Sequence, residues 1–323
     1  MSKRMVVFDH DGGIDDLIAL MLLLQMEDIE LIGVTLTPAD CYLSDALLAT
    51  QKLLTLCGQT HIPIGLGRCH GVNAFPSNWR AQPKIVLALP QMLNLEPDPV
   101  ITIHDDAESL LTDIIRASDT PVTVVMTGPC TNLSNALDNA ADLTDKIEQA
   151  IWMGGALNVR GNVVTFNHNG SAEWNAFWDP DATARFIASS VEKTLVPLDA
   201  TNCLPIDMDF LRQLAGQSAN GLSELAGQFW AATVNTLPSY EFTYYMWDVL
   251  TVLLLAPELA EQEYQTEPVV VYTTEPMAGA IKPQQIQGQF SCPVGAKGQI
   301  RYPVNVNRDI AISTLMRLLG KSV

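Results

Sequence analysis

The sequence predicts an α/β fold: a mostly parallel central sheet flanked by helices, open at its edges, in one domain over residues 1–323. Short apolar runs alternate with amphipathic segments, which is typical of a parallel sheet covered on both faces. The chain has 323 residues, of which 48% are hydrophobic, so it can bury a large core. Neither a repeat nor a linker interrupts the pattern, and we therefore expect a single domain.

The apolar runs are interpreted as strands and the segments between them as helices. We expect strands at residues 5–8, 29–36, 62–66, 121–128, 193–198 and 268–274. We expect helices at residues 15–26, 44–57, 106–118, 131–140 and 308–320, and mostly helix after residue 205. Ligands of such sheets bind at the carboxyl ends of the strands. The loops that carry Asp11, Asp40 and Thr127 are therefore expected to meet in one crevice.

The composition excludes several classes of partner. A formal net charge of −18 would repel nucleic-acid phosphates, so we expect no nucleic acid. No apolar run approaches the roughly 20 residues of a membrane span, so we expect no membrane either. The run at residues 5–8 is too short for a signal peptide. The six cysteines contain no C-x-x-C motif, and we expect reduced thiols in a cytoplasmic protein.

The segment "VVFDHDGGIDDLIAL" (residues 6–20) places Asp9, Asp11, Asp15 and Asp16 within eight positions. Carboxylates this close repel one another, and a cation is the obvious compensation. Hard oxygen ligands on a glycine-containing turn suit Ca²⁺ or Mg²⁺. Asp15 and Asp16 alone could be acidic residues in the first turn of a helix. The neighbouring carboxylates are expected to favour the protonated form of His10, in a structural role.

One enzyme class with a strand followed by D-x-D-G is the haloacid-dehalogenase-like phosphatases, which use Mg²⁺. Their pattern requires Thr or Val after the D-x-D-G, and an acidic pair after a late glycine. Here Gly13 follows Gly12, and no "GD" occurs in the chain. This alternative is therefore weakened.

A series of segments resembles the nucleoside hydrolase family in order along the chain. They are "DHDGGIDD" (9–16), "VTLTPADC" (34–41), "MTGPCTNLSNAL" (126–137), "IWMGGALNVRGN" (151–162), "AEWNAFWDPDAT" (172–183) and "YYMWDVLTVLLLAPEL" (244–259). Asp40, "FPSNWR" around Trp79, "EWN" at 173–175 and "WD" at 247–248 resemble the purine-preferring branch, the inosine-adenosine-guanosine-preferring hydrolases. Gly13 departs from that branch, which has Asn there.

The resemblance implies Ca²⁺-dependent hydrolysis of the N-glycosidic bond of purine ribonucleosides, giving ribose and free base. It implies that Asp11, Asp16, Asp248 and the main-chain carbonyl of Thr127 hold the Ca²⁺ ion. It also implies that Asp11 is the general base and that Asp9 orients its neighbours. The residues implied to bind substrate are Asp15, Asp40, Trp79, Met153, Asn162, Glu173, Trp174, Asn175 and Trp247.

Trp247 stands where many members of the family have a histidine, and the resemblance implies a catalytic role in stacking on the purine. Trp79 would stack on the other face, and solvent would protonate the departing base. Simpler interpretations remain open: core packing for Trp247, a turn for Asn162, and a surface loop for Glu173 and Asn175. A calcium-dependent nucleoside-binding protein without catalysis also remains open. The purine-preferring branch implies a homodimer.

Overall fold

The computed structural model describes residues 3–217, 221–234, 243–290 and 292–321. Its strands are β1 (Arg4–His10), β2 (Ile29–Leu36), β3 (Ile64–Leu66), β4 (Ile103–His104), β5 (Val122–Met126), β6 (Ile147–Met153), β7 (Lys193–Val196), β8 (Tyr264–Tyr272), β9 (Ile281–Pro283) and β10 (Val294–Pro303). Within the described residues they form one ten-stranded sheet in the order β4-β3-β2-β1-β5-β6-β7-β10-β8-β9. The pairs from β4 to β10 are parallel, and β8 is antiparallel to both β10 and β9. The mostly parallel sheet is as predicted.

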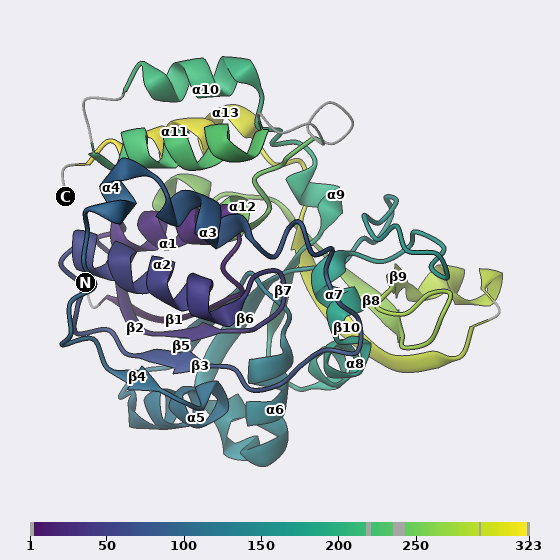
Figure 1. Cartoon of the computed structure of the whole chain (residues 1–323). Helices are drawn as coiled ribbons and strands as arrows, with labels where there is room; N and C mark the ends of the chain where they lie inside the picture. Colours follow the sequence, from purple (N-terminus) through teal and green to yellow (C-terminus); the bar gives the residue numbers. More distant parts are fainter. Residues whose placement is uncertain (1–2, 218–220, 235–242, 291, 322–323) are drawn as a thin grey trace.

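Helices cover both faces of this sheet (Figure 1). They are α1 (Ile14–Leu24), α2 (Leu43–Leu56), α3 (Gln82–Leu87), α4 (Pro90–Leu93), α5 (Ala107–Ala117), α6 (Thr131–Asn139), α7 (Trp174–Trp178), α8 (Pro180–Ala188), α9 (Leu198–Thr201), α10 (Met208–Ala215), α11 (Gly221–Val234), α12 (Trp247–Leu253) and α13 (Arg308–Leu319). Short 3₁₀ turns lie at Ala141–Asp145, Pro257–Leu259 and Gln284–Gln289. In the described part of the chain no helix is both long and apolar enough to cross a membrane.

Two large clusters of apolar side chains form the core, one on each face of the sheet. One is built around α1, which is buried on every side from Ile14 to Leu23 and packs against α12. The other lies under α5, α6 and α8. A helix that is apolar all round belongs in the interior. The acidic segment at the start of α1 is therefore fixed to the most buried helix of the molecule.

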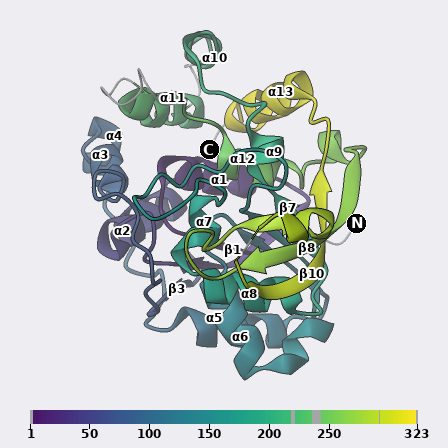
Figure 2. The ribbon, with the colours of Figure 1, turned by 90° about the vertical axis from the view of Figure 1, so that its right-hand side faces the viewer.

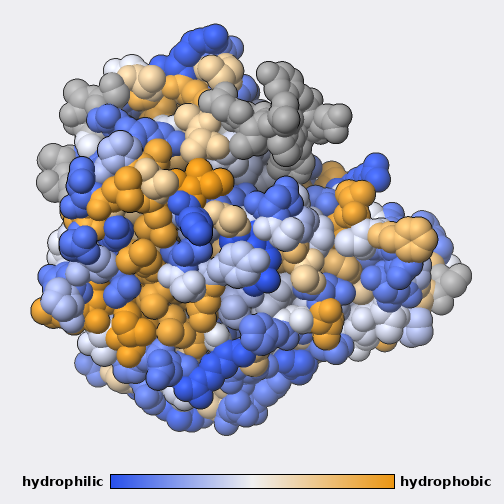
Figure 3. Space-filling model, in the orientation of Figure 1, coloured by the Kyte–Doolittle hydropathy of each residue, from blue (hydrophilic) through white to orange (hydrophobic). Residues whose placement is uncertain are grey.

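Apolar side chains also gather on the outer face in front of α2, α3 and α4 (Figure 3). There Ile85 is 40% exposed and Leu93 is 60% exposed. Single exposed apolar residues are normal on a protein surface. Ile85 has a second importance, because it also lines the cavity described below.

The ends of the central strands are level with one another. Asp9 in β1 pairs with Thr35 in β2 and with Met126 in β5. The amide of Thr127 then donates to the Asp9 carbonyl at 2.8 Å. Strand β1 is longer than expected, so Asp9 lies inside it. The predicted meeting of loops at one edge of the sheet is confirmed.

The expectation of mostly helix after residue 205 is confirmed by α10, α11 and α12, but strands follow from residue 264. Strands β8, β9 and β10 make an antiparallel extension of the sheet, and only part of β8 was expected. Strand β10 (sequence VGAKGQIRYP) carries two glycines and a lysine, residue types that are depleted in strands. Strand β6 was also not predicted, although Met153 at its end was expected near the substrate.

Candidate active site

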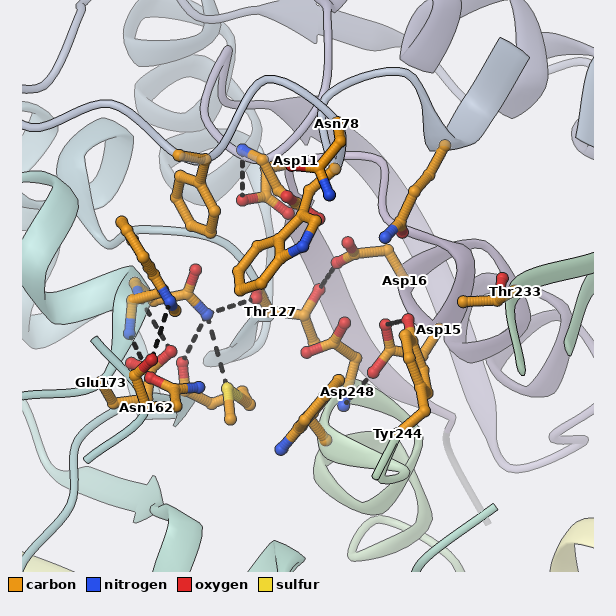
Figure 4. A pocket seen from close by; sticks show the side chains of 18 of the residues that line it. Asp11, Asp15, Asp16, Asn78, Thr127, Asn162, Glu173, Thr233, Tyr244 and Asp248 are labelled. Carbon is orange, nitrogen blue, oxygen red and sulfur yellow. Dashed lines mark hydrogen bonds between the residues drawn. The ribbon is translucent and has the colours of Figure 1, made fainter. Parts of the chain in front are cut away.

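A cavity of about 310 Å³ opens at the carboxyl ends of the strands. All thirteen residues that the sequence assigned to metal or substrate line it: Asp11, Asp15, Asp16, Asp40, Trp79, Thr127, Met153, Asn162, Glu173, Trp174, Asn175, Trp247 and Asp248. They come from segments spread over more than two thirds of the chain. Figure 4 shows the carboxylates near the centre of the cavity, with Glu173 and Asn162 on one side and Tyr244 on the other.

The acidic loop turns tightly between β1 and α1. Gly12 has a φ of +89°, and a Cβ there would lie 2.4 Å from the Cβ of Ala46, so only glycine fits. The amide of Gly13 donates to the Asp16 carboxylate at 2.7 Å and caps α1. The hydroxyl of Thr127 donates to the other oxygen of Asp16. The side chain of Asp16 is thereby fixed between β5 and α1.

Asp9 lies beneath the cavity and does not line it. Its carboxylate accepts hydrogen bonds from Thr35 at 2.6 Å, Thr37 at 3.1 Å and Asn132 at 2.8 Å. Burial raises the pKa of Asp9 to about 6, although these three donors oppose the shift. The side chain therefore links β1, β2 and α6 below the loop that carries Asp11.

The carboxylates in the cavity are buried together and raise one another's pKa. Burial raises the pKa of Asp16 to about 7, and the charge of Asp15 adds to the shift. Burial also raises the pKa of Asp40 to about 8, with the charges of Asp16 and Asp15 adding to it. The pKa of Asp11 and that of Asp248 are well above the ordinary range, first because of burial and then because of the neighbouring carboxylates.

The buried carboxylates disfavour one another's charge. The charges of Asp16 and Asp40 add to the rise in the pKa of Asp11, and those of Asp15, Asp16 and Asp11 add to the rise in the pKa of Asp248. A bound cation would relieve this repulsion, because an opposite charge favours the charged form of a carboxylate.

The donor set fits a divalent cation. It combines hard carboxylate oxygens with the main-chain carbonyl of Thr127, the ligands that Ca²⁺ takes in proteins. Among the described residues, none of the cavity carboxylates forms an ion pair. The buried Oδ1 of Asp40 has no hydrogen-bond partner. In the described ranges, no three acidic, histidine or cysteine side chains already lie together in the arrangement of a metal shell.

The expectation for His10 is wrong. Complete burial lowers the pKa of His10 to about 3, so the ring is neutral despite the carboxylates on either side of it in sequence. The side chain points away from the cavity, where it stacks on Phe8 and lies 3.3 Å from the hydroxyl of Thr50. Desolvation therefore outweighs the attraction of the acidic residues. The structural role is as expected.

Glu173, Asn175 and Asn162 lie on one side of the cavity and are held by hydrogen bonds; this side is called the polar wall. Glu173 caps α7 by accepting from the amide of Asn175 at 2.9 Å, and it also accepts from the amide of Gly155 at 3.1 Å. Burial raises the pKa of Glu173 to about 7. The side chain of Asn162 accepts from the amide of Trp174 at 3.1 Å. With Glu173 3% exposed and Asn175 6% exposed, the surface-loop interpretation of these two residues is wrong.

Aromatic side chains line another part of the cavity, called the aromatic wall: Phe75, Trp79, Trp174, Tyr244 and Trp247. The ring of Trp79 meets that of Trp174 edge-on at 5.5 Å, and Trp174 stacks on Phe75 at 5.1 Å. Trp247 lies 4.7 Å from the ring of Tyr244. Trp247 packs partly against the core and also lines the cavity, so core packing explains only part of its surroundings.

Seven cavity residues were not assigned from the sequence: Phe75, Asn78, Gln82, Ile85, Ala232, Thr233 and Tyr244. Tyr244 is the most informative of them, because its hydroxyl donates to Asp15 at 2.7 Å. It lies three residues before Trp247 and four before Asp248, but no local sequence pattern marks it as a site residue. Gln82 accepts weakly from the amide of Ile14 at 3.4 Å and so touches the first turn of α1.

Comparisons with known proteins agree on the type of fold and site. Residues 6–310 match the model of the family described as inosine-uridine preferring nucleoside hydrolase. The pyrimidine-specific ribonucleoside hydrolase RihA of Shewanella sp. (strain ANA-3) is 30% identical over 233 residues, 70% of each chain. The RihA of Klebsiella pneumoniae (strain 342) is 27% identical over 237 residues, 70% of this chain and 71% of its own.

Solved structures extend the likeness to almost the whole chain. An inosine-uridine preferring nucleoside hydrolase from Bacillus anthracis superposes with a TM-score of 0.86 at 33% identity, covering 98% of this chain and 99% of its own. A purine-preferring ribonucleoside hydrolase from Gardnerella vaginalis superposes with a TM-score of 0.75 at 21% identity, covering 98% of each chain. At that identity the second likeness supports the fold alone.

Proposed function

The chain belongs to the inosine-uridine preferring nucleoside hydrolase family, and we propose that within it this protein is a Ca²⁺-dependent hydrolase that prefers purine ribonucleosides. One observation supports the proposal above all. A single cavity brings together six carboxylates, the side-chain amides of Asn162 and Asn175, and the rings of Trp79, Trp174 and Trp247. The reaction replaces the bond between the sugar and the base nitrogen by a bond to water.

Asp11 is the proposed general base, because it lies among the carboxylates of the cavity and burial raises the pKa of its carboxyl group. Its Oδ2 accepts from the amide of Asp40 at 3.0 Å, which fixes the carboxylate. Asp11, Asp16, Asp248 and the carbonyl of Thr127 would hold the Ca²⁺ ion. When bound, the ion would orient the attacking water and lower its pKa.

The polar wall is proposed to bind ribose. Asp15, Asp40 and Asn175 would take the 2′ and 3′ hydroxyls, and Asn162 and Glu173 the 5′ hydroxyl. Met153 would pack against the sugar from the end of β6. Dense hydrogen bonding of this kind rejects analogues that lack a hydroxyl, because buried polar groups are then left unpaired.

The aromatic wall is proposed to bind a purine base. None of the residues seen to line the cavity in the described ranges is a histidine, so no imidazole there would protonate the departing base. Trp79 and Trp247 would instead stack on the base as it accumulates negative charge, and solvent would supply the proton to N7. Stacking contributes about 0.5–1.5 kcal/mol beyond burial of area, which favours a two-ring base.

The relatives named above include pyrimidine-specific enzymes, so the choice of base needs a direct test. Ribose release should be measured with a reducing-sugar assay on inosine, adenosine, guanosine, uridine and cytidine, before and after a chelator. We expect release from the purine nucleosides, lost with chelator and restored by Ca²⁺. Release from uridine equal to that from inosine would contradict the purine preference. Calorimetric binding of inosine without any ribose release would instead identify a non-catalytic binding protein.

The proposal extends to the setting of the enzyme. The six cysteines form no disulfide in the described residues, which suits a reducing compartment such as the cytoplasm. A purine nucleoside hydrolase there would serve purine salvage. The resemblance to the purine-preferring branch supports a homodimer, which light scattering on the purified protein tests.

A further inference from the structure

The antiparallel extension of the sheet packs behind the polar wall of the cavity. Figure 2 shows β8 and β10 crossing in front of the parallel strands, close to α7. The turn between β8 and β9 meets the loop before α7 at two points. The carbonyl of Ala278 lies 3.0 Å from Nε2 of His168, and the amide of Asn169 donates to the carbonyl of Pro276 at 2.9 Å. Strand β9 follows this turn.

Lys282 in β9 is the one polar residue of that strand, and it is only 6% exposed. Its ammonium donates to the carbonyl of Ala156 at 2.6 Å, and it lies 3.3 Å from that of Leu157 and 3.4 Å from that of Val159. An ammonium has three N–H donors. All three are therefore directed at the main chain of one loop, residues 155–159.

Asp199 in α9 holds the same loop by its amides. One carboxylate oxygen accepts from the amide of Leu157 at 2.8 Å, and the other accepts from the amide of Asn158 at 2.8 Å. Burial lowers the pKa of Lys282, and the charge of Asp199 opposes that shift. The loop is thus held between the ammonium of Lys282, which binds its carbonyls, and the carboxylate of Asp199, which binds its amides.

Gly155 begins this loop and touches the cavity wall. Its φ of +86° is in the left-handed region that favours glycine. Its carbonyl accepts from the amide of Leu198 at 3.0 Å, and its amide donates to Oε2 of Glu173 at 3.1 Å. The orientation of that amide sets one of the hydrogen bonds that fix the Glu173 carboxylate.

We propose that Lys282 is a positioning residue for the reaction, acting through the 155–159 loop and the amide of Gly155 on the carboxylate of Glu173. The proposal rests on the proposed function, in which Glu173 binds the 5′ hydroxyl of the sugar. Lys282 does not line the cavity, so its effect on substrate must pass through the loop. Asp199 is its partner in holding the loop.

Two variants test the proposal against simple loss of stability. Lys282→Met removes the ammonium and keeps the length of the side chain. Lys193→Met is the matched control, because Lys193 is also 6% exposed and its ammonium also binds main-chain carbonyls, those of Ser189 and Val191 at 2.7 Å each. Lys193 lies at the start of β7, at the opposite edge of the sheet from the cavity.

The experiment measures the ratio of kcat/KM for inosine to kcat/KM for 5′-deoxyinosine. If the wild type cleaves only pyrimidine nucleosides, uridine and 5′-deoxyuridine are used instead. A hydrogen bond to a charged group contributes about tenfold or more to such a ratio. We expect Lys282→Met to lose most of the wild-type preference for the 5′ hydroxyl, and Lys193→Met to keep it. Equal ratios in wild type, Lys282→Met and Lys193→Met would overturn the proposal.

Two further arms cover the remaining cases. If Lys282→Met does not fold, Asp199→Ala replaces it, because Asp199 is partly exposed and holds the same loop. Asp199→Ala should lower the ratio of kcat/KM for inosine to that for 5′-deoxyinosine, and an unchanged ratio would overturn the proposal. If the wild type cleaves no nucleoside, the proposed function fails. Calorimetry then measures the dissociation constants of inosine and 5′-deoxyinosine. A smaller preference for inosine in Lys282→Met than in the wild type supports the positioning role, and an unchanged preference contradicts it.

Discussion

The side-chain amide of Asn175 donates to the carbonyl of Thr127 at 2.8 Å and to the carbonyl of Met153 at 3.1 Å. Both of its N–H bonds are therefore directed into the protein. The remaining polar atom is Oδ1, which is an acceptor and suits a sugar hydroxyl. One side chain thus links a carbonyl of the candidate cation site, the end of β6 and the polar wall of the cavity.

Asn175→Ala should lower kcat/KM on the preferred nucleoside by about tenfold to hundredfold, since loss of a hydrogen bond in a buried site costs about 1–3 kcal/mol. It should also weaken Ca²⁺ binding, because the Thr127 carbonyl loses the donor that orients it. Steady-state kinetics and a calcium titration measure the two effects. Kinetics within threefold of the wild type would contradict the role of Asn175 in sugar binding.

Asp11→Asn should reduce turnover by several orders of magnitude. A positioned general base alone contributes about 10²–10⁴-fold, and this variant also removes a negative charge from the cation site. Single-turnover kinetics with saturating Ca²⁺ measure the loss, and circular dichroism checks the fold. Near-normal turnover in a folded, calcium-loaded variant would remove Asp11 from the mechanism.

The protein without Ca²⁺ should become less stable as the pH rises from 6 to 8. Asp16 and Asp40 have pKa values of about 7 and about 8 in the folded chain, above the ordinary 3.8 that applies when it is unfolded. The folded state therefore binds more protons in this window, and stability falls as the pH rises. Thermal unfolding of the metal-free protein at both pH values tests the sign.

Added Ca²⁺ should reverse this trend, because it binds the charged carboxylates and stabilises only the native state. At a hundredfold excess over Kd the gain is about 2.7 kcal/mol, which corresponds to a few degrees in Tm. We expect a larger gain at pH 8 than at pH 6. A gain that is absent, or larger at pH 6, would argue against a cation held by these carboxylates.

Trp247→Ala should lower kcat for inosine more than it raises KM, because stacking matters most as charge develops on the departing base. In the wild type, kcat/KM for inosine should exceed that for uridine by at least about two orders of magnitude, or roughly 2.7 kcal/mol. Trp247→Phe keeps a smaller ring, so its kcat for inosine should lie between the values of the wild type and Trp247→Ala. An unchanged kcat in Trp247→Ala would contradict the stacking role.

Tyr244→Phe should weaken substrate binding by about tenfold, because Asp15 loses the donor at 2.7 Å that orients it toward the cavity. Tyr272→Phe is the control: this tyrosine is fully buried, its hydroxyl lies 3.5 Å from the carbonyl of Gln287, and it does not line the cavity. KM for the preferred nucleoside and Tm of both variants should be compared. Equal kinetics in the two variants would assign Tyr244 to packing alone.

The site was predictable where chemistry and spacing coincide. The carboxylates of the acidic loop, Asp40 and the W-D pair can be recognised from the sequence alone. Acidic residues that directly follow an apolar strand repel one another, and this repulsion indicates a bound cation. Tyr244 and Gln82 have no such signal. Their importance comes from where the chain places them, next to Asp15 and Ile14, and no local pattern encodes that placement.

The fold was predictable where mostly buried strands consist of short, largely apolar runs, as in β1, β2 and β5. It was not predictable in β10, where alternation and two glycines describe a strand that is half exposed. Lys282 was missed for the same reason, because it lies in a three-residue strand of that region. His10 was misjudged because a sequence shows nearby charge but does not show burial.

The last described residue, Lys321, binds the segment that joins α1 to β2, at the end of the strands opposite the cavity. The ammonium of Lys321, after α13, lies 2.9 Å from the carbonyl of Gln25 and 2.8 Å from the carboxylate of Glu27, beside the starts of β1 and β2. Strand β1 puts roughly 20 Å between this end of the strands and the acidic loop. A purification tag or a surface tether joined near either end would therefore leave the mouth of the cavity facing outward, which suits immobilised assays.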